Sequence, residues 1–404
     1  MWFRNRIYAD AAAATPLSKR SARELVRLLR IYGNAGAIHR EGVAAKRELE
    51  KARKSIADSI GAHADEILFT ASGTEGNNLA IQGVIRPLLQ KQKGELHAIT
   101  CAVEHQSVLE PLRALQREGL VVSEVGVDGE GVVFPNTLSN NIRPDTVFVS
   151  LQLVNSEMGA IEPVRELARE IRKIRTLRQA QGDLPLYFHT DASQAPLWVD
   201  INVEKLGVDL MTLDAQKVLG PKGVGALYVR RGVPIEALLW GGKQERGLRG
   251  GTENVAAAGA FAVALADAKR GVEKRVKNMT AVRDYLWAEI KRLIPDAKYQ
   301  GPSLMSDIKD GPCLRVANNL NISIPGLEAE MGVVSLDALG ISASTRSACT
   351  IGADEPSHVI KALGVPLDMA GTAIRLTLLP DATKSQARRI AQALKETADR
   401  YRQS

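Results

Sequence analysis

The stretch that decides the fold runs from Asp214 to Gly225 and reads Asp-Ala-Gln-Lys-Val-Leu-Gly-Pro-Lys-Gly-Val-Gly. It follows an apolar run, Val208 to Leu213, and precedes a second, Ala226 to Val229, so the pattern predicts a strand, a turn and a strand. Lys217 stands at the end of the first strand. A lysine at such a place can project from a rigid sheet edge into a cleft and act in Schiff-base chemistry, although many lysines beside Gly-Pro turns are simply solvated.

A second stretch supplies the partner that such a lysine needs. Residues Tyr187 to Gln194 read Tyr-Phe-His-Thr-Asp-Ala-Ser-Gln, an apolar strand that ends near Asp191, 26 residues before Lys217. Enzymes that use pyridoxal 5'-phosphate (PLP) need a lysine for the aldehyde of the cofactor and a carboxylate that keeps its pyridine nitrogen protonated. The two stretches together indicate a PLP site.

Composition is typical of a globular protein from a reducing compartment, and we expect the cytoplasm. With 404 residues, 45% hydrophobic and 25% charged, the chain is long enough for two domains. Its cysteines, Cys101, Cys313 and Cys349, lie too far apart for a disulfide framework or a metal site. The first residues lack a signal-peptide core, and no apolar run is long enough for a bilayer. The net charge of +7 comes from helical segments with interleaved acids, so direct nucleic-acid binding is not expected.

Apolar runs alternate with helical periodicity from about residue 65 to residue 230. This alternation predicts an open, mostly parallel sheet with helices on both faces. The expected strands are Ile67–Thr70, His97–Thr100, Val121–Val125, Thr146–Leu151, Leu186–His189 and Asp209–Leu213. Because ligands bind such sheets at the carboxyl ends of the strands, the polar residues that follow these runs are candidates for the site. These residues are Ser72, Gly73, Thr74, His105, Asn155, Asp191 and Lys217.

The pattern changes after about residue 265, where a second architecture begins. The elements expected there are a long charged helix, Ala266–Leu293, strands at Leu320–Ile324 and Ala373–Leu379, and an amphipathic helix, Lys384–Arg402. We therefore expect a large domain of residues 15–265 and a smaller α+β domain of residues 1–14 and 266–404. Gln179 to Asp183 is expected to form a surface loop.

Three motifs have both a structural and a functional interpretation. The segment Thr70 to Asn78 contains a glycine turn at a helix start, which can be a plain helix cap or a phosphate cradle. His105 could be an ordinary interior histidine. Cys349 could be a small buried apolar residue, but its small polar neighbours favour an exposed loop. We expect that loop, Thr345 to Pro356, to be mobile.

Taken in order, these motifs resemble the PLP-dependent cysteine desulfurases, a branch of the class V aminotransferase group within fold type I. The resemblance runs from residue 8 to about residue 380. Further segments that carry it are Tyr8–Ala13, Tyr32–Asn34, Ile38–His39, Leu153–Gly159, Gly241–Thr252 and Glu355–Ser357. It implies a large domain with a mostly parallel seven-stranded sheet, and a small domain that carries a mobile cysteine loop.

The resemblance also implies roles for individual residues. Lys217 would bind the cofactor aldehyde, Asp191 would pair with the pyridine nitrogen, and His105 would stack on the ring and move a proton. Cys349 would accept sulfur as a persulfide. The remaining cofactor contacts would come from Gln194 at the phenolic oxygen, from Gly73, Thr74 and Gln216 at the phosphate, from Thr252 of a partner subunit, and from Asn155. The substrate carboxylate would be held by Asn34, Asn155 and Arg375, since an arginine fork suits a planar anion.

The sequence departs from the usual family pattern at several positions. The common Ser-x-His-Lys is here Asp214-Ala215-Gln216-Lys217. Gln216 can still donate to phosphate, whereas Asp214 would repel it if the side chain pointed inward, so we do not include Asp214 in the phosphate site. Arg346, in place of glycine, could lower the pKa of the nearby Cys349 thiol or only face solvent. The segment from residue 172 to residue 185 looks longer than usual, and the tail by which some members dock a scaffold protein is not expected.

The implied activity is removal of sulfur from L-cysteine, which gives L-alanine and a persulfide on Cys349. The persulfide would pass to an iron–sulfur scaffold or a tRNA-thiolation enzyme, and the active form would be a homodimer. The alternatives are selenocysteine lyase, another class V aminotransferase and an epimerase, none of which requires Cys349. A non-catalytic partner protein with this fold would be expected to have lost Lys217 or Asp191, and both are present.

Overall fold

A seven-stranded sheet lies at the centre of the computed structural model, which describes residues 6–92, 94–181, 184–304, 314–345 and 356–403. In spatial order its strands are β2 (Ile67–Thr70), β8 (Gly225–Val229), β7 (Leu210–Asp214), β6 (Tyr187–Asp191), β5 (Thr146–Ser150), β3 (Leu96–Cys101) and β4 (Leu120–Val125). Strand β8 runs antiparallel to both of its neighbours, and the other pairs are parallel. The expected mostly parallel sheet is confirmed.

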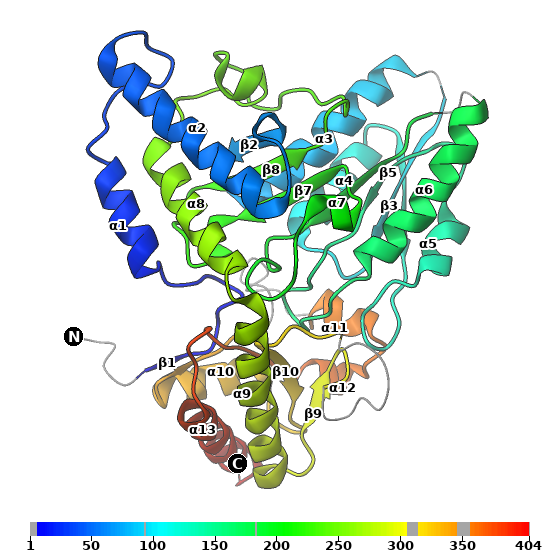
Figure 1. The fold of residues 1–404 in the computed structure, drawn as a ribbon. Coiled ribbons are helices and arrows are strands. Elements are labelled where there is room, and N and C mark those ends of the chain that lie inside the picture. The colour runs from blue at the N-terminus through cyan, green and yellow to red at the C-terminus, as the bar shows by residue number, and fades with distance from the viewer. Residues whose placement is uncertain (1–5, 93, 182–183, 305–313, 346–355, 404) are drawn as a thin grey trace.

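Helices cover both faces of this sheet (Figure 1). Consecutive residues of a strand pack into different hydrophobic cores. Leu210 packs with α3 (Gly73–Lys91) and α4 (Gln106–Gln116), whereas Met211 lies in the core shared with helices of the opposite face. Those helices are α2 (Arg40–Ile60), α6 (Val164–Gln181) and α8 (Val255–Lys269), with α1 (Lys19–Leu28) and α5 (Pro135–Asn141) packed against them. Burial on both faces explains why the strands are continuous apolar runs.

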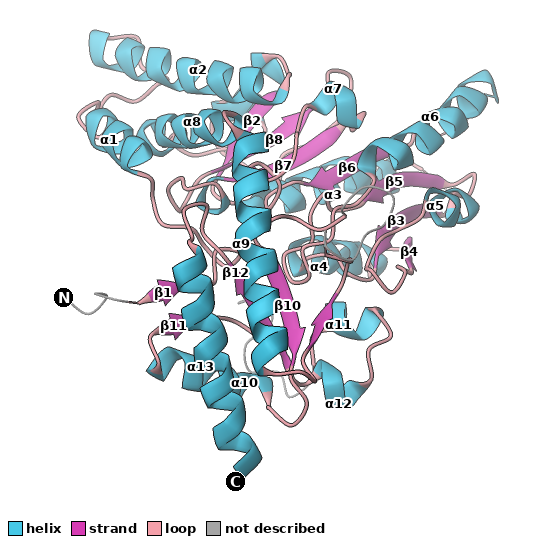
Figure 2. Cartoon of the chain, turned by 60° about the horizontal axis from the view of Figure 1, so that its bottom comes forward, coloured by secondary structure: helices cyan, strands magenta, loops and turns pink. Residues whose placement is uncertain are grey.

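A smaller group of elements lies below the sheet in Figure 1 and comes forward in Figure 2. Its strands are β9 (Lys298–Gln300), β10 (Asn319–Ser323) and β12 (Ala373–Thr377), which are antiparallel, and the parallel pair β1 (Ile7–Tyr8) and β11 (Ile341–Ser342). Its helices are α9 (Val272–Leu293), α10 (Ala329–Ala338), α11 (His358–Ala362), α12 (Leu367–Ala370) and α13 (Lys384–Gln403). The N-terminal segment thus pairs with elements from the far end of the chain. The domain division at residues 14/15 and 265/266 stays a prediction.

Two expectations about local structure are wrong. The residues of the helix expected over Ala266–Leu293 are instead divided between α8, which ends at Lys269, and α9, which begins at Val272. The helix is interrupted because Gly271, between them, adopts a left-handed conformation (φ 68°). The loop expected from Gln179 begins later, since α6 continues through Gln181. The predicted strand boundaries agree to within about one or two residues, which is the usual uncertainty of element ends.

Four short helical elements remain among the described residues. They are the α-helix α7 (Val203–Leu206) and the 3₁₀ helices η1 (Ala64–Glu66), η2 (Ala215–Lys217) and η3 (Gln244–Gly247). None of the helices in the described part of the chain is both long and apolar enough to cross a bilayer.

Candidate active site

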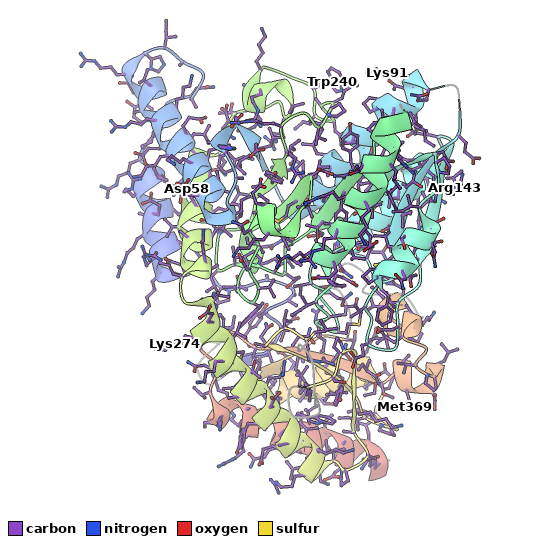
Figure 3. The ribbon with its side chains drawn as sticks, turned by 45° about the vertical axis from the view of Figure 1, so that its right-hand side comes forward. Asp58, Lys91, Arg143, Trp240, Lys274 and Met369 are labelled. Carbon is purple, nitrogen blue, oxygen red and sulfur yellow. The ribbon has the colours of Figure 1, made fainter. Side chains whose placement is uncertain are left out.

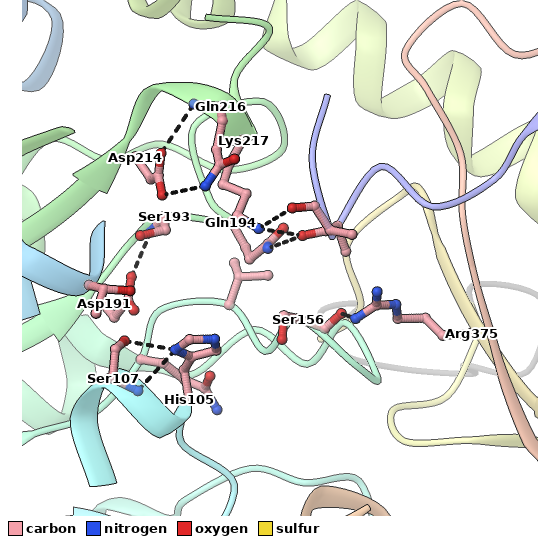
Figure 4. Close-up of a pocket in the computed structure, with 15 residues that line it drawn as sticks. His105, Ser107, Ser156, Asp191, Ser193, Gln194, Asp214, Gln216, Lys217 and Arg375 are labelled. Carbon is pink, nitrogen blue, oxygen red and sulfur yellow. Dashed lines mark hydrogen bonds between the residues drawn. The ribbon is translucent and has the colours of Figure 1, made fainter. Parts of the chain in front are cut away.

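Seven of the predicted residues line one pocket at the carboxyl edge of the sheet (Figure 4). Strands β2, β3, β5, β6 and β7 all point toward this edge, so the residues that follow them converge. The predicted residues that line it are Thr74, His105, Asp191, Gln194, Gln216, Lys217 and Arg375. Residues without a predicted role also line it, namely Ala12, Ala13, Ser107, Gln152, Val154, Ser156, Ser193 and Asp214.

Lys217 enters the pocket from η2, directly after β7. Its Nζ donates hydrogen bonds to the carbonyl oxygens of Ala12 and Ala13, both at 2.7 Å. The turn that follows includes Leu219 at φ 64°, a strained value for a non-glycine residue. Thr15 stabilises this turn, because its hydroxyl donates to Gln216 O (2.7 Å) and accepts from Leu219 N (2.8 Å). The N-terminal segment therefore fixes the position of the lysine.

One end of the pocket, which we call the histidine end, is formed by Asp191, Asn77, Ser107 and His105. The Asn77 amide donates to Asp191 Oδ2 (2.7 Å) and to Ser107 Oγ (2.8 Å). Ser107 in turn contacts His105 Nδ1 through its hydroxyl (2.7 Å), and the backbone N–H of Ser107 donates to the same nitrogen (3.1 Å). A continuous hydrogen-bond chain thus joins the carboxylate to the imidazole.

Burial lowers the pKa of His105 and so favours its neutral ring. The Asp191 carboxylate opposes that effect and Lys217 adds to it. Because a backbone N–H donates to Nδ1, the proton of the neutral ring lies on Nε2.

The other end, which we call the helix end, is formed by Gly73, Thr74, Asp214 and Gln216 at the start of α3. Gly73 N donates to Asp214 Oδ2 (3.2 Å), and Gln216 donates to the same carboxylate through its backbone N (3.1 Å) and its side-chain Nε2 (3.1 Å). Asp214 is only 6% exposed and points inward, which is the orientation that would repel a phosphate. A Cβ at position 73 would lie 2.9 Å from Ser193 Oγ, so a side chain there would displace the Ser193 hydroxyl.

Arg375 reaches the pocket from β12 of the smaller group of elements. It is 1% exposed and its Nη2 pairs with Asp10 Oδ1 at 2.7 Å, while Nη1 donates to Ser156 O at 3.3 Å. Its Nε is buried without a partner among the described residues. A buried guanidinium with unused donors is suited to binding a carboxylate.

Several predicted residues lie outside this pocket. Asn155 is 3% exposed, and its side chain bonds Val103 O (2.9 Å) and the N–H groups of Glu157 and Met158. Asn34 is exposed and accepts from Gly36 N. Thr252 lines a separate cavity of the same chain, beside Thr70. Cys349 and Arg346 lie outside the described residues. The roles assigned to these residues stay predictions.

Sequence reasoning assigned no role to Asn77, Ser107, Ser193 and Asp10. The first two stand within motifs that were recognised, three residues after Thr74 and two after His105. Three and four residues is the helical spacing that places side chains on one face, so Asn77 could have been found as an inward neighbour. Asp10 offers no such signal, because its partner Arg375 lies 365 residues away.

Comparison with known proteins gives one consistent result. The family described as aminotransferase class-V matches residues 7–390. A protein named cysteine desulfurase IscS from Dictyoglomus turgidum is 40% identical over 376 residues, which are 93% of this chain and 90% of that protein. A second protein named cysteine desulfurase IscS, from Methanosarcina thermophila, is 37% identical over a region that covers 98% of this chain and 93% of that protein. A solved structure titled NifS-like protein is 32% identical, with a TM-score of 0.87 over 97% of this chain and 98% of that one.

Proposed function

Because the chain belongs to the cysteine desulfurase branch of the class V aminotransferase family, we propose that it removes sulfur from L-cysteine, releases L-alanine and leaves a persulfide on Cys349. The observation that carries this proposal is that Lys217, Asp191 and Arg375 line a single pocket. A lysine, a carboxylate and a carboxylate-binding arginine are what PLP chemistry on an amino acid requires.

The residues present fit PLP. The Ser193 hydroxyl is buried, lines the pocket and has no hydrogen-bond partner among the described residues, so it can donate to a ligand. Lys217 would hold the aldehyde, Asp191 the pyridine nitrogen, and Gln194 the phenolic oxygen. The phosphate would take Gly73 N, Thr74 and Gln216. When bound, PLP supplies an electron sink that stabilises negative charge at the substrate Cα.

Residues of the chain itself would bind the substrate, transfer protons and accept the sulfur. Arg375 holds the substrate carboxylate with the donors that Asp10 leaves unused. Lys217 Nζ would move the Cα proton, and the neutral His105 ring would take up a proton and pass it on. The Cys349 thiolate attacks the substrate sulfur. The S–S bond forms as the C–S bond breaks, so that alanine retains the electron pair and takes up a proton.

The flanks of the Cys349 segment support its assignment as the nucleophile. On one side, Ser344 exchanges backbone hydrogen bonds with Arg375. On the other, Ser357 Oγ donates to Glu157 Oε2 (2.5 Å), and His358 Nε2 lies 3.0 Å from the carbonyl oxygen of Glu104, next to His105. The described residues on both sides of Cys349 therefore contact Arg375, which lines the pocket, and Glu104, which precedes the pocket residue His105.

We further infer a homodimer in which Thr252 completes the helix end of the partner's pocket. Gly36 and Lys243 line one cavity. Near each of them in the sequence stands a large apolar residue that is strongly exposed: Ile38 is 97% exposed and Trp240, labelled in Figure 3, is 81% exposed. Exposed apolar side chains of this size are typical of a contact surface. The persulfide would then pass to an acceptor protein in the cytoplasm, an iron–sulfur scaffold or a tRNA-thiolation enzyme.

Selenocysteine lyase is the second candidate, as it could use the same pocket without Cys349. The deciding experiment is incubation of purified protein with L-cysteine, followed by peptide mass spectrometry and an alanine assay. One labile sulfur is expected on Cys349, and Cys349→Ser should form no alanine. Cys101→Ser is the matched control and should keep full activity, because Cys101 is buried and burial raises its thiol pKa well above the usual value. A label on Cys101, or normal turnover by Cys349→Ser, would overturn the proposal.

A further inference from the structure

The helix end of the pocket already contains an anion supplied by the chain itself. We propose that the Asp214 carboxylate competes with the cofactor phosphate for the donors of the helix end, so that the phosphate binds there together with one proton. This inference rests on the proposed PLP chemistry. It concerns how tightly, and at what pH, the protein takes up its cofactor.

The carboxylate of Asp214 occupies donors that the phosphate would need. Its carboxylate accepts from Gly73 N, Gln216 N and Gln216 Nε2 at 3.1–3.2 Å. Gly73 N is the first amide of α3, a helix of 19 residues, and its N-terminus attracts negative charge. Two of these three donors, Gly73 N and Gln216 Nε2, are those assigned above to the phosphate. Figure 4 shows Asp214 and Gln216 directed toward each other at this end of the pocket.

An independent observation indicates that a ligand also belongs at this end. Ser193 is 8% exposed, its Oγ has no partner among the described residues, and that oxygen would lie 2.9 Å from a Cβ on Gly73. Buried hydroxyl groups are normally hydrogen-bonded, so one without a partner beside a helix N-terminus is free to donate to a ligand. The helix end therefore holds an internal carboxylate and, next to it, an unused donor.

Two anions at one set of donors repel each other unless a proton lies between them. A phosphate monoester has its second pKa near 6 and an aspartate near 4, so neither anion holds a proton strongly at neutral pH by itself. When two such groups are forced together they titrate as a pair, and the first proton binds more tightly. Either the Asp214 carboxylate or the phosphate can carry that proton. A hydrogen bond between the two groups then takes the place of the repulsion between their negative charges.

Other charged groups in this region also respond to pH. Lys217, Asp191, His105 and Arg375 line the same pocket. On α3, Glu75 is paired with Arg249 (Nε–Oε1 3.0 Å). All six are unchanged in a variant at position 214, so a comparison of that variant with the parent protein cancels their contributions.

The test is cofactor binding to the full-length apoprotein between pH 6.5 and 8.5, with no turnover measured. Dissociation constants come from the visible absorbance of bound PLP, and proton uptake comes from calorimetry in two buffers of different ionisation enthalpy. The variants are Asp214→Asn and Asp214→Ser, both of which keep an acceptor for Gln216 N and so preserve the local turn. Asp200→Asn is the matched control, because Asp200 caps Asn202 N in the same way outside this pocket.

We expect the parent protein and Asp200→Asn to take up about one proton more than the position-214 variants, and the affinity difference to grow about tenfold per pH unit. Pyridoxal, which lacks the phosphate, should bind all four proteins with the same pH dependence. Equal PLP affinity and equal proton uptake in parent and variants would overturn this proposal and leave the proposed function intact. Failure of every protein to bind PLP at any pH would overturn both.

Discussion

The two ends of the pocket carry the same residue type, an aspartate, for which we propose opposite roles. Asp191 and Asp214 each close one of two neighbouring parallel strands, β6 and β7, and each accepts hydrogen bonds at 2.7–3.2 Å. At the histidine end the donors to Asp191 are Asn77 and Ser193 N, neither of which we assign to a ligand's phosphate. At the helix end two of the three donors to Asp214, Gly73 N and Gln216 Nε2, are those we assign to the phosphate. The environment of an acid, and not its position after a strand, decides whether it assists or hinders a ligand.

The strongest test of this contrast is removal of the charge at each end. Asp191→Asn should lower kcat/KM by about 10³-fold, because it removes the charge that keeps the pyridine nitrogen protonated. Asp214→Asn should leave kcat within about twofold at saturating PLP, since it removes only a competing anion. Steady-state alanine formation measures both. Equal losses at the two ends would mean that the contrast is wrong.

A weaker effect, with a signature in pH, is expected from His105. Burial lowers its pKa below the usual 6.5, so the ring loses its neutral form only under more acidic conditions. The acid limb of the kcat/KM profile, which reports groups of the free protein, should therefore lie below pH 6.5. His105→Gln should lower kcat/KM by about 10²-fold and remove that limb, because glutamine does not titrate. An acid limb that persists in His105→Gln would assign the titration to another group.

The smallest effect is expected from Thr252, which we assign to the helix end of the partner's pocket. Thr252→Ala should weaken PLP binding about tenfold, the value of one hydrogen bond to a charged group, and leave kcat at saturating PLP unchanged. Equilibrium dialysis of PLP measures the affinity, and sedimentation reports the oligomer. A fully active monomer with unchanged PLP affinity would remove Thr252 from the site.

The pattern of apolar runs was sufficient to predict the sheet, because strands buried on both faces must be apolar at every position. It also predicted that Lys217, Asp191 and His105 would share an edge, since parallel strands bring their carboxyl ends together. The break at Gly271 between α8 and α9 was missed, because the surrounding charged residues continue a helical pattern on both sides.

By itself, the sequence determined which residue types stand at the strand ends, and with them the class of chemistry. Only the tertiary structure decided what each of those residues contacts. Asp214 meets Gly73 across 141 residues, Arg375 meets Asp10 across 365, and Asn155 turns to its own loop instead of the pocket. The positions of the strands along the chain follow from local patterns of burial, whereas the direction of a side chain depends on donors brought close by the packing of distant segments.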